Sequence, residues 1–469
     1  MRDVKFLLNR GAIVVVLLVA GCANAPRGDG DPLAQPPPAS TLTDVGADLD
    51  AVLEHGALQG ACDRWRAGDA SERLRCGKEM FFYESFGTGG VPTVLAQFLI
   101  DNFPDDIGPG FGRLGMVADP SSATHLPLGL APTAKLGGSV DAVAFTCASC
   151  HFARLPDGRY AVGAPNHAYA YGRQILALVL LPSLAIGAST SGHDPAAVAA
   201  VQPLLDRVAA DASLKNALLA DLLPLVGAAG GMPTLSSADE HHYASWLSGT
   251  MDFLIAPLPV DDGVHTVSKI SALWSIPAPS EADDAQLGWT GGTRSVADFL
   301  SGFVLVGGGD TRAWTSDALG PLADYVLSLR APANPSPPDA AAVERGRAAF
   351  FADGCAGCHG GPRGMGPRLY DFGELGTDDA MAAWATSGIP AGAPFVVTGK
   401  IKAPRLVGTW AMSRFLHDGA VPSLESLFCL EPRPSATPPD TAMGSGGHDM
   451  TCKLPGNDAR DLIAYLRAR

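Results

Sequence analysis

The sequence predicts a mainly α-helical protein built from two domains of unequal size. Amphipathic helical patterns recur along the chain, whereas alternating strand patterns are few and no solenoid period is present. A Pro-rich connector at residues 331–340 interrupts the helical pattern, because a helix cannot continue through it. One Cys-x-x-Cys-His pentad lies on each side of this connector, at 147–151 and 355–359.

The composition excludes two broad classes of protein. The chain has 469 residues, of which 47% are hydrophobic and 17% charged, so it can bury a sizeable core and is not a disordered polymer. The formal net charge is −15, and no long Lys/Arg run is present. A chain this acidic lacks the electrostatic footprint of a nucleic-acid-binding protein, and we expect no nucleic-acid partner.

The N-terminus has the pattern of an export signal. Three basic residues flank or precede the uncharged run 11–21, which is shorter than the roughly 20 apolar residues of a spanning helix. Its ending, Val19-Ala20-Gly21-Cys22, resembles the lipobox of bacterial lipoproteins. The resemblance implies a signal peptide at 1–21 and acylation of Cys22. It also implies attachment to a lipid membrane in the bacterial cell envelope, facing the periplasm or at the outer membrane. An ordinary signal peptide cut elsewhere, or an uncleaved anchor, is the alternative.

The N-terminal region divides into a tether and a large domain. Residues 22–45 are rich in Pro, Ala and Gly and predict a flexible, extended tether. Residues 46–330 form the predicted N-terminal domain, with helical patterns at 71–86, 195–225 and 237–254. Its most apolar run, Ile175–Ile186, contains Pro182 and is too short to span a membrane, which favours a buried helix or the wall of an apolar substrate site.

The C-terminal domain at 341–469 begins and ends with predicted helices. The first helix covers 340–352 and precedes the second pentad. The last covers 458–467, with Asn457 as its N-cap and Leu462, Ile463 and Leu466 as its buried face.

The two pentads predict covalent haem attachment. Two cysteines three residues apart can form thioethers with the two vinyl groups of one haem, and the following histidine reaches the iron. We therefore expect two c-type haems, attached through Cys147 and Cys150 and through Cys355 and Cys358, with His151 and His359 as iron ligands. A zinc ribbon is disfavoured because its two Cys pairs lie about 15–20 residues apart. A redox dithiol would need only one motif.

Further motifs connect the chain to a known group. They are Leu287–Ser295, Leu322–Pro332, Arg345–Phe350, Leu375–Asp378, Thr398–Pro404, Phe415–Leu424 and Gly447-His448. Over about Gly77 to Arg469 the chain resembles the superfamily of bacterial di-haem cytochrome c peroxidases, MauG-type maturation enzymes and rubber oxygenases. The resemblance implies two cytochrome c-type haem domains, the first enlarged by extra helices and loops.

The second iron departs from the peroxidase pattern. In those peroxidases a Met about 14 residues beyond the His-Asp-Gly histidine binds this iron, but the corresponding position here is Glu431. Our first choice of distal ligand is His448, as in a rubber-oxygenase-like bis-histidine centre. The alternatives are Met450, His417 and Met412, any of which can instead be structural.

For the first iron no distal ligand stands out. His167, His125 and Met116 are candidates, but a lone histidine is more often structural than a ligand. If none of them binds, this iron keeps the open face that an oxidase or peroxidase needs. The superfamily places a tryptophan between its haems to relay electrons. Trp289 is our first candidate, Trp274 also lies between the pentads, and burial in the core is the alternative for both.

Four cysteines remain, as two neighbouring pairs. An exported protein lies in an oxidising compartment, so we expect disulfides Cys62–Cys76 and Cys429–Cys452. Free buried thiols are the alternative.

These features predict a membrane-anchored di-haem c-type oxidoreductase. It would transfer electrons with a redox partner protein and activate peroxide or dioxygen at one haem. The alternative is a non-catalytic electron carrier with both irons six-coordinate, docking through its acidic surface. A third possibility is a lipoprotein whose haems only stabilise a binding domain.

Overall fold

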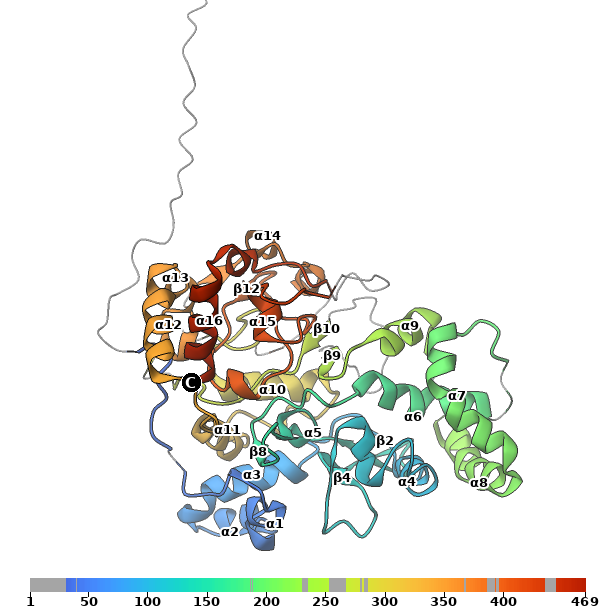
Figure 1. Ribbon diagram of the computed structural model, residues 1–469. Helices are drawn as coiled ribbons and strands as arrows, with labels where there is room; N and C mark the ends of the chain where they lie inside the picture. The colour runs from blue at the N-terminus through green and yellow to red at the C-terminus, as the bar shows by residue number, and fades with distance from the viewer. Residues whose placement is uncertain are drawn as a thin grey trace, which may run out of the picture.

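The protein was analysed as a computed structural model (Figure 1) that describes residues 31–38, 40–185, 187, 189–229, 235–252, 267–278, 281, 286–366, 368–385, 393, 396–434 and 444–469. The expected signal peptide, Cys22 and the first part of the expected tether lie outside the described residues. No helix among the described residues is both long and apolar enough to cross a membrane.

The chain is rich in helix and carries only small antiparallel sheets, which agrees with the mainly α prediction. The α-helices are α1 (Leu49–Val52), α2 (Ala61–Arg66), α3 (Arg73–Tyr83), α4 (Thr93–Asn102), α5 (Cys147–His151), α6 (Tyr171–Ala185), α7 (Pro195–Ala210), α8 (Ala212–Ala229), α9 (Ser237–Ser245), α10 (Val296–Val306), α11 (Gly320–Ser328), α12 (Ala340–Ala352), α13 (Ala356–His359), α14 (Phe372–Leu375), α15 (Leu424–Leu427) and α16 (Gly456–Arg467). The strands are β1 (Val45–Gly46), β2 (Val91–Pro92), β3 (Val117–Ala118), β4 (Pro127–Leu128), β5 (Leu130–Leu136), β6 (Val140–Phe145), β7 (Phe152–Arg154), β8 (Tyr160–Val162), β9 (Thr250–Asp252), β10 (Val267–Lys269), β11 (Leu369–Tyr370) and β12 (Ile401–Lys402).

The small sheets serve mainly to hold the first pentad. Strands β5 and β6 form a hairpin with β2 on its other edge, and β6 leads directly into α5, which is the first pentad itself. Strand β7 leaves α5 at once and pairs with β8, which also pairs with β1. The pentad is therefore held between two sheets at both of its ends.

Helices α3 and α11 cross closely at Gly77 although they lie far apart in the sequence. A Cβ atom at Gly77 would lie 2.1 Å from the carbonyl oxygen of Pro321 and 2.6 Å from Cβ of Tyr325, so only glycine fits there. One turn further along α3, the ring of Phe81 meets that of Tyr325 edge-on with centroids 6.0 Å apart.

Helices α12 and α16 repeat this arrangement in the C-terminal part, where they lie side by side (Figure 1). A Cβ atom at Gly346 would lie 1.9 Å from the carbonyl oxygen of Asp461 and 2.8 Å from Cβ of Tyr465. Phe350, four residues after Gly346, packs edge-on against Tyr465 with centroids 5.5 Å apart. Each crossing thus joins a Gly-x-x-x-Phe helix, which precedes a pentad, to a Leu-x-x-Tyr helix.

Between these two helix pairs the chain runs without regular structure. Helix α11 ends at Ser328 and α12 begins at Ala340, and the Pro-rich residues 331–339 form neither helix nor strand. The sequence predicts this break from its prolines.

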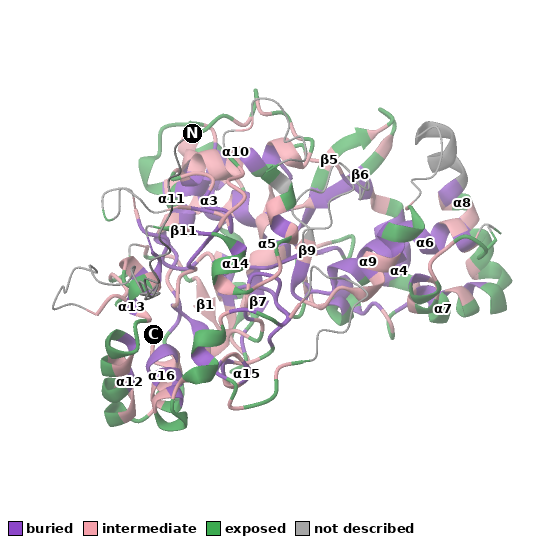
Figure 2. Ribbon diagram, turned by 90° about the horizontal axis from the view of Figure 1, so that it is seen from above, coloured by how far each residue is buried: buried purple, intermediate pink, exposed green. Residues whose placement is uncertain are grey.

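The apolar run of the N-terminal region forms the buried helix α6. It packs against α7 and α9, and nearly all of its side chains between Tyr171 and Leu184 are buried, Pro182 included. Figure 2 shows the exposed outer face of α7 beside these buried helices. The expectation of a buried helix holds for the described part of the run, up to Ala185.

Residues 31–38 differ from the flexible tether that the sequence predicts. Leu33 is fully buried against the C-terminal core. Asp31 accepts a hydrogen bond from the hydroxyl of Tyr465 at 2.6 Å and pairs with Arg469 at 2.6 Å. Gln35 accepts a hydrogen bond from Ser275 at 2.6 Å. Composition alone suggested a solvated chain, because it contains no information on these distant partners.

Both expected cysteine pairs are disulfide-bonded in the structure. Cys62 of α2 bonds to Cys76 of α3, with Cα atoms 4.3 Å apart. Cys429, just after α15, bonds to Cys452, with Cα atoms 5.0 Å apart. The four pentad cysteines are free thiols.

Candidate cofactor site

One cavity of about 860 Å³ receives residues of both pentads. Cys147, Cys150 and His151 line it from one side, and Cys355, Cys358 and His359 line it from the other. Its walls are mostly aliphatic and aromatic, with a few charged groups between the pentads. A mostly apolar cavity with few convergent polar groups is the usual form of a cofactor site.

The first pentad is capped at its start by Thr146. The Thr146 hydroxyl accepts a hydrogen bond from the Ala148 amide at 3.3 Å and donates one to the Phe82 carbonyl at 3.1 Å. Ser149 donates to the carbonyl of Gly129 at 2.7 Å. These bonds fix the short helix α5, and both of its thiols line the cavity. Burial raises the pKa of Cys147 and of Cys150 to about 12.

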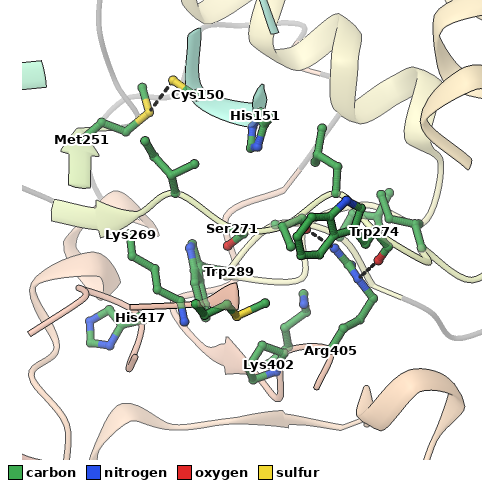
Figure 3. A pocket seen from close by; sticks show the side chains of 18 of the residues that line it. Cys150, His151, Met251, Lys269, Ser271, Trp274, Trp289, Lys402, Arg405 and His417 are labelled. Atoms are coloured by element: carbon green, nitrogen blue, oxygen red, sulfur yellow. Dashed lines mark hydrogen bonds between the residues drawn. The ribbon is translucent and has the colours of Figure 1, made fainter. Parts of the chain in front are cut away.

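His151 projects from α5 toward the segment that carries Ser271 and Trp274, as Figure 3 shows. Burial lowers the pKa of His151 to about 4, so the imidazole is neutral, the form that binds a metal. Its Nδ1 is buried and has no hydrogen-bond partner. The sulfur of Met251 lies 3.7 Å from Sγ of Cys150, which places a thioether beside the first pentad.

The second pentad has a fixed imidazole. Nδ1 of His359 lies 2.7 Å from the carbonyl oxygen of Gly364 and donates to it, since a carbonyl can only accept. This bond places the proton on Nδ1 and leaves Nε2 free to bind a metal. Burial lowers the pKa of His359 as well.

His448 faces His359 across the cavity. The ring centroids lie 6.4 Å apart with the planes 63° from parallel. Two imidazoles bound to one metal ion from opposite sides at about 2.0–2.1 Å have centroids about 6.3 Å apart. The observed spacing leaves room for one metal ion between the two rings, and it also lies in the range of an ordinary edge-to-face ring contact. Burial, helped by nearby Arg433, lowers the pKa of His448 to about 4.

The backbone of His448 is held in a strained conformation. Its φ of 57° lies in the left-handed region, where a non-glycine residue is uncommon. The His448 amide donates to the carbonyl of Leu375 at 2.8 Å, and the preceding Gly447 packs against Thr377. Strain that neighbouring contacts maintain is common at functional positions.

The alternative distal candidates line the same cavity. Met412 is partly buried, Met450 is 47% exposed, and the ring of His417 lies 3.3 Å from an oxygen of Asp378. In the described part of the cavity wall, the histidines are His151, His359, His417 and His448. Met365 is buried.

The candidates named for the first iron lie elsewhere among the described residues. His167 uses both ring nitrogens for structure: Nε2 donates to the Ile270 carbonyl at 3.0 Å, and Nδ1 accepts from the Ser413 amide at 3.1 Å. His125 pairs with Asp101 in an exposed ion pair. Met116 accepts a long hydrogen bond from Gln174, and none of the three lines the cavity.

Three buried cations between the pentads were not anticipated from the sequence. Burial and nearby Arg405 lower the pKa of Lys402 to about 7, and burial lowers that of Lys269 to about 8 and that of Arg405 to about 10. Arg405 donates to the carbonyls of Trp274 at 3.0 Å and Ala272 at 2.6 Å. The Lys269 ammonium donates to the Arg414 carbonyl at 3.1 Å and lies over the rings of Trp289 and Phe415, so its described partners are neutral groups.

Trp274 and Trp289 both line the cavity (Figure 3). The indole of Trp274 donates to the Val162 carbonyl at 2.8 Å and is fully buried between the backbones at Gly163 and Gly408. The indole nitrogen of Trp289 is buried without a partner. Sequence reasoning favoured Trp289, but the structure gives both rings access to the cavity.

Comparisons with known proteins found little similarity. No family model matches the chain, and none of the curated proteins matches it. A solved structure, hydrazine synthase of Kuenenia stuttgartiensis pressurised with xenon, shares 19% sequence identity at a TM-score of 0.30, covering 49% of this chain and 79% of that chain. A TM-score this low carries no inference about the present chain.

Proposed function

We propose that the protein is a di-haem c-type oxidoreductase. The observation that carries the proposal is the His359–His448 pair, two neutral imidazoles with centroids 6.4 Å apart in a cavity lined by both pentads. One haem would be attached through Cys147 and Cys150, the other through Cys355 and Cys358. When bound, haem supplies one-electron redox chemistry and can activate peroxide or dioxygen at an open iron position.

The residues present fit two haems. The cavity supplies four free thiols, neutral pentad histidines and apolar walls. Haem carries two carboxylates, and the buried Lys402 and Lys269 and the half-buried Arg405 are basic side chains that line the same cavity. Charge-assisted bonds from these side chains to the haem carboxylates would satisfy both sides.

The two sites would have different roles. At the second pentad, His359 and His448 would hold the haem iron between them, which suits electron storage. At the first pentad, His151 would hold the iron, and the fourth histidine of the described wall, His417, pairs with Asp378. Trp274 and Trp289 lie along the cavity between them and are both candidates for an electron relay.

The repeated helix crossing supports two cytochrome c-type domains, at 46–330 and 341–469. The Gly77–Tyr325 and Gly346–Tyr465 contacts place equivalent helix pairs around the two pentads. We further propose that acylated Cys22 anchors the protein to a membrane in the bacterial cell envelope and that a redox protein supplies its electrons. These proposals also draw on the resemblance to di-haem peroxidases, MauG-type enzymes and rubber oxygenases.

Two observations favour specific variants of this function. The thioether of Met251, 3.7 Å from Cys150 Sγ, would be the sulfur available to the first haem in an electron carrier with both irons six-coordinate. Ile175 and Leu178 of α6 line the same cavity as Cys150. That apolar wall favours dioxygen chemistry on an apolar substrate.

The test is haem stoichiometry in matched variants. Holo protein, matured in an exporting host, is analysed by pyridine haemochrome and by intact mass. The proposal predicts two haems per chain, and one in each of the double variants Cys147→Ala/Cys150→Ala and Cys355→Ala/Cys358→Ala. Cys62→Ala/Cys76→Ala is the control and keeps two. Haem content that does not change with the pentad cysteines contradicts the proposal.

A further inference from the structure

Three side chains from two loops converge beside the cavity. His417 and Asp418 lie in a tight turn that is closed by mutual backbone bonds between Phe415 and Val421. Asp378 comes from the segment that follows α14. One ligand atom from each side chain lies within 4.8 Å of the other two.

The three atoms are buried without hydrogen bonds. Nε2 of His417, Oδ2 of Asp378 and Oδ2 of Asp418 have no hydrogen-bond partner. His417 is 3% exposed and Asp418 is 0% exposed. Nε2 of His417 and Oδ2 of Asp378 face each other as an ion pair at 3.3 Å, so the fully buried Oδ2 of Asp418 is the atom left without a partner. An unpartnered buried carboxylate oxygen is costly and indicates a missing partner.

The spacing fits a metal ion. His417 Nε2 lies 3.3 Å from Asp378 Oδ2 without the alignment of a hydrogen bond. Two ligands at about 2.0–2.1 Å from a tetrahedral metal ion are about 3.3 Å apart. One nitrogen and two carboxylate ligands suit zinc or manganese, whereas calcium prefers an all-oxygen set.

The opposite sides of these side chains are already oriented. The other oxygen of Asp418 accepts from the Ala420 amide at 3.0 Å, and Nδ1 of His417 lies 3.4 Å from the hydroxyl of Thr377. Phe372 covers the His417 ring, with centroids 5.7 Å apart. Such outer contacts commonly fix the direction of metal ligands.

Charge balance also favours a cation. The cluster holds two carboxylates, whose combined charge matches that of one divalent ion. Such an ion would neutralise both buried carboxylates, which otherwise carry a large desolvation cost.

We propose that Asp378, His417 and Asp418 bind a divalent transition metal of the zinc or manganese class. The ion cross-links the 415–421 turn and the segment 375–378, because each contributes ligands. That segment supplies the Leu375 carbonyl that receives the His448 amide and the Thr377 contact to Gly447. The metal therefore stabilises the loop that presents His448, and the site itself does not depend on the haem assignment.

The test measures non-iron metal in folded holo protein. The protein is incubated with zinc sulfate or manganese chloride, desalted, and analysed by inductively coupled plasma mass spectrometry with iron as internal reference. We expect about one zinc or manganese per chain, and less than a tenth in Asp378→Asn/Asp418→Asn. Asp379→Asn, a change at the exposed neighbouring aspartate, is the matched control and keeps the metal.

A second measurement needs no variant. X-ray absorption at the zinc edge of the loaded wild-type protein should show only nitrogen and oxygen neighbours, with an imidazole. Equal metal in the wild type and the folded double variant overturns the proposal, as does less than a tenth of a metal per wild-type chain. The latter result would assign the cluster to a protonated imidazole between carboxylates. Iron content reports separately on the haems.

Discussion

The crossing of α12 and α16 gives a sharp test of the C-terminal fold. In Gly346→Ala the new methyl group would lie 1.9 Å from the Asp461 carbonyl oxygen and 2.8 Å from Cβ of Tyr465. An ordinary C···O contact is about 3.3 Å or longer, so the helices must separate by about 1.4 Å. Overpacking of this kind costs about 3 kcal/mol, and the higher helix propensity of alanine returns about 1 kcal/mol.

The net loss of about 2 kcal/mol predicts a melting temperature lower by roughly 5–10 °C. The assay is thermal unfolding of oxidised holo protein, followed by far-ultraviolet circular dichroism. Gly373→Ala is the control, because its Cβ would meet nothing within 4 Å. It should melt at the wild-type temperature or slightly above it. A Gly346→Ala protein that melts like Gly373→Ala would refute the close crossing.

Three further predictions concern pH, redox potential and the membrane. Burial lowers the pKa of His167 to about 3, so the unfolded chain takes up this proton first as pH falls. The stability that neutral His167 provides is complete above about pH 6.5 and falls by about 3 kcal/mol by pH 4. In His167→Asn the free energy of unfolding, measured with denaturant, should depend less on pH over this range. The same pH dependence as in the wild type would contradict a neutral, buried His167. Lys402→Met removes a buried cation beside the cavity, so the reduction potential of at least one haem should fall by tens of millivolts in a redox titration. The control Lys400→Met changes a less buried lysine two residues away and should leave the potentials of both haems unchanged. Cys22→Ser should move the protein from the membrane to the soluble fraction of a cell-envelope preparation without changing its haem content, and equal membrane association of both forms excludes the lipid anchor.

The features that depend only on residues close together in the sequence could be predicted from the sequence. The pentads could be found because haem attachment needs five consecutive positions. The cysteine pairs 62/76 and 429/452 could be proposed because their members lie close in sequence. Helix α16 could be predicted from its apolar face at Leu462, Ile463 and Leu466, but the predicted N-cap Asn457 is wrong, because the helix begins at Gly456 with Pro455 in the N-cap position.

Other features depend on contacts between distant segments. Lys402 was present in the motif Thr398–Pro404 and Arg405 follows it, but only the folded chain shows that Lys402 is buried and that Arg405 donates to the carbonyls of Ala272 and Trp274. His167 is buried and His448 is half-buried, and only the tertiary hydrogen bonds of His167 distinguish a structural residue from a ligand candidate. The Gly-x-x-x-Phe pattern at Gly77 and Gly346 is not sufficient to predict the crossings, because it also occurs at Gly249, which precedes strand β9.

The proposed function places a bis-histidine haem at the second pentad beside an open haem at the first. Low-temperature electron paramagnetic resonance, with optical spectra of the same lipid-free holo protein, tests this arrangement in the oxidised and half-reduced states. We expect one low-spin haem, lost in His448→Ala, and one high-spin haem that changes on adding peroxide or dioxygen. Two low-spin haems that are indifferent to both oxidants in either state, and to the His448 change, would contradict it.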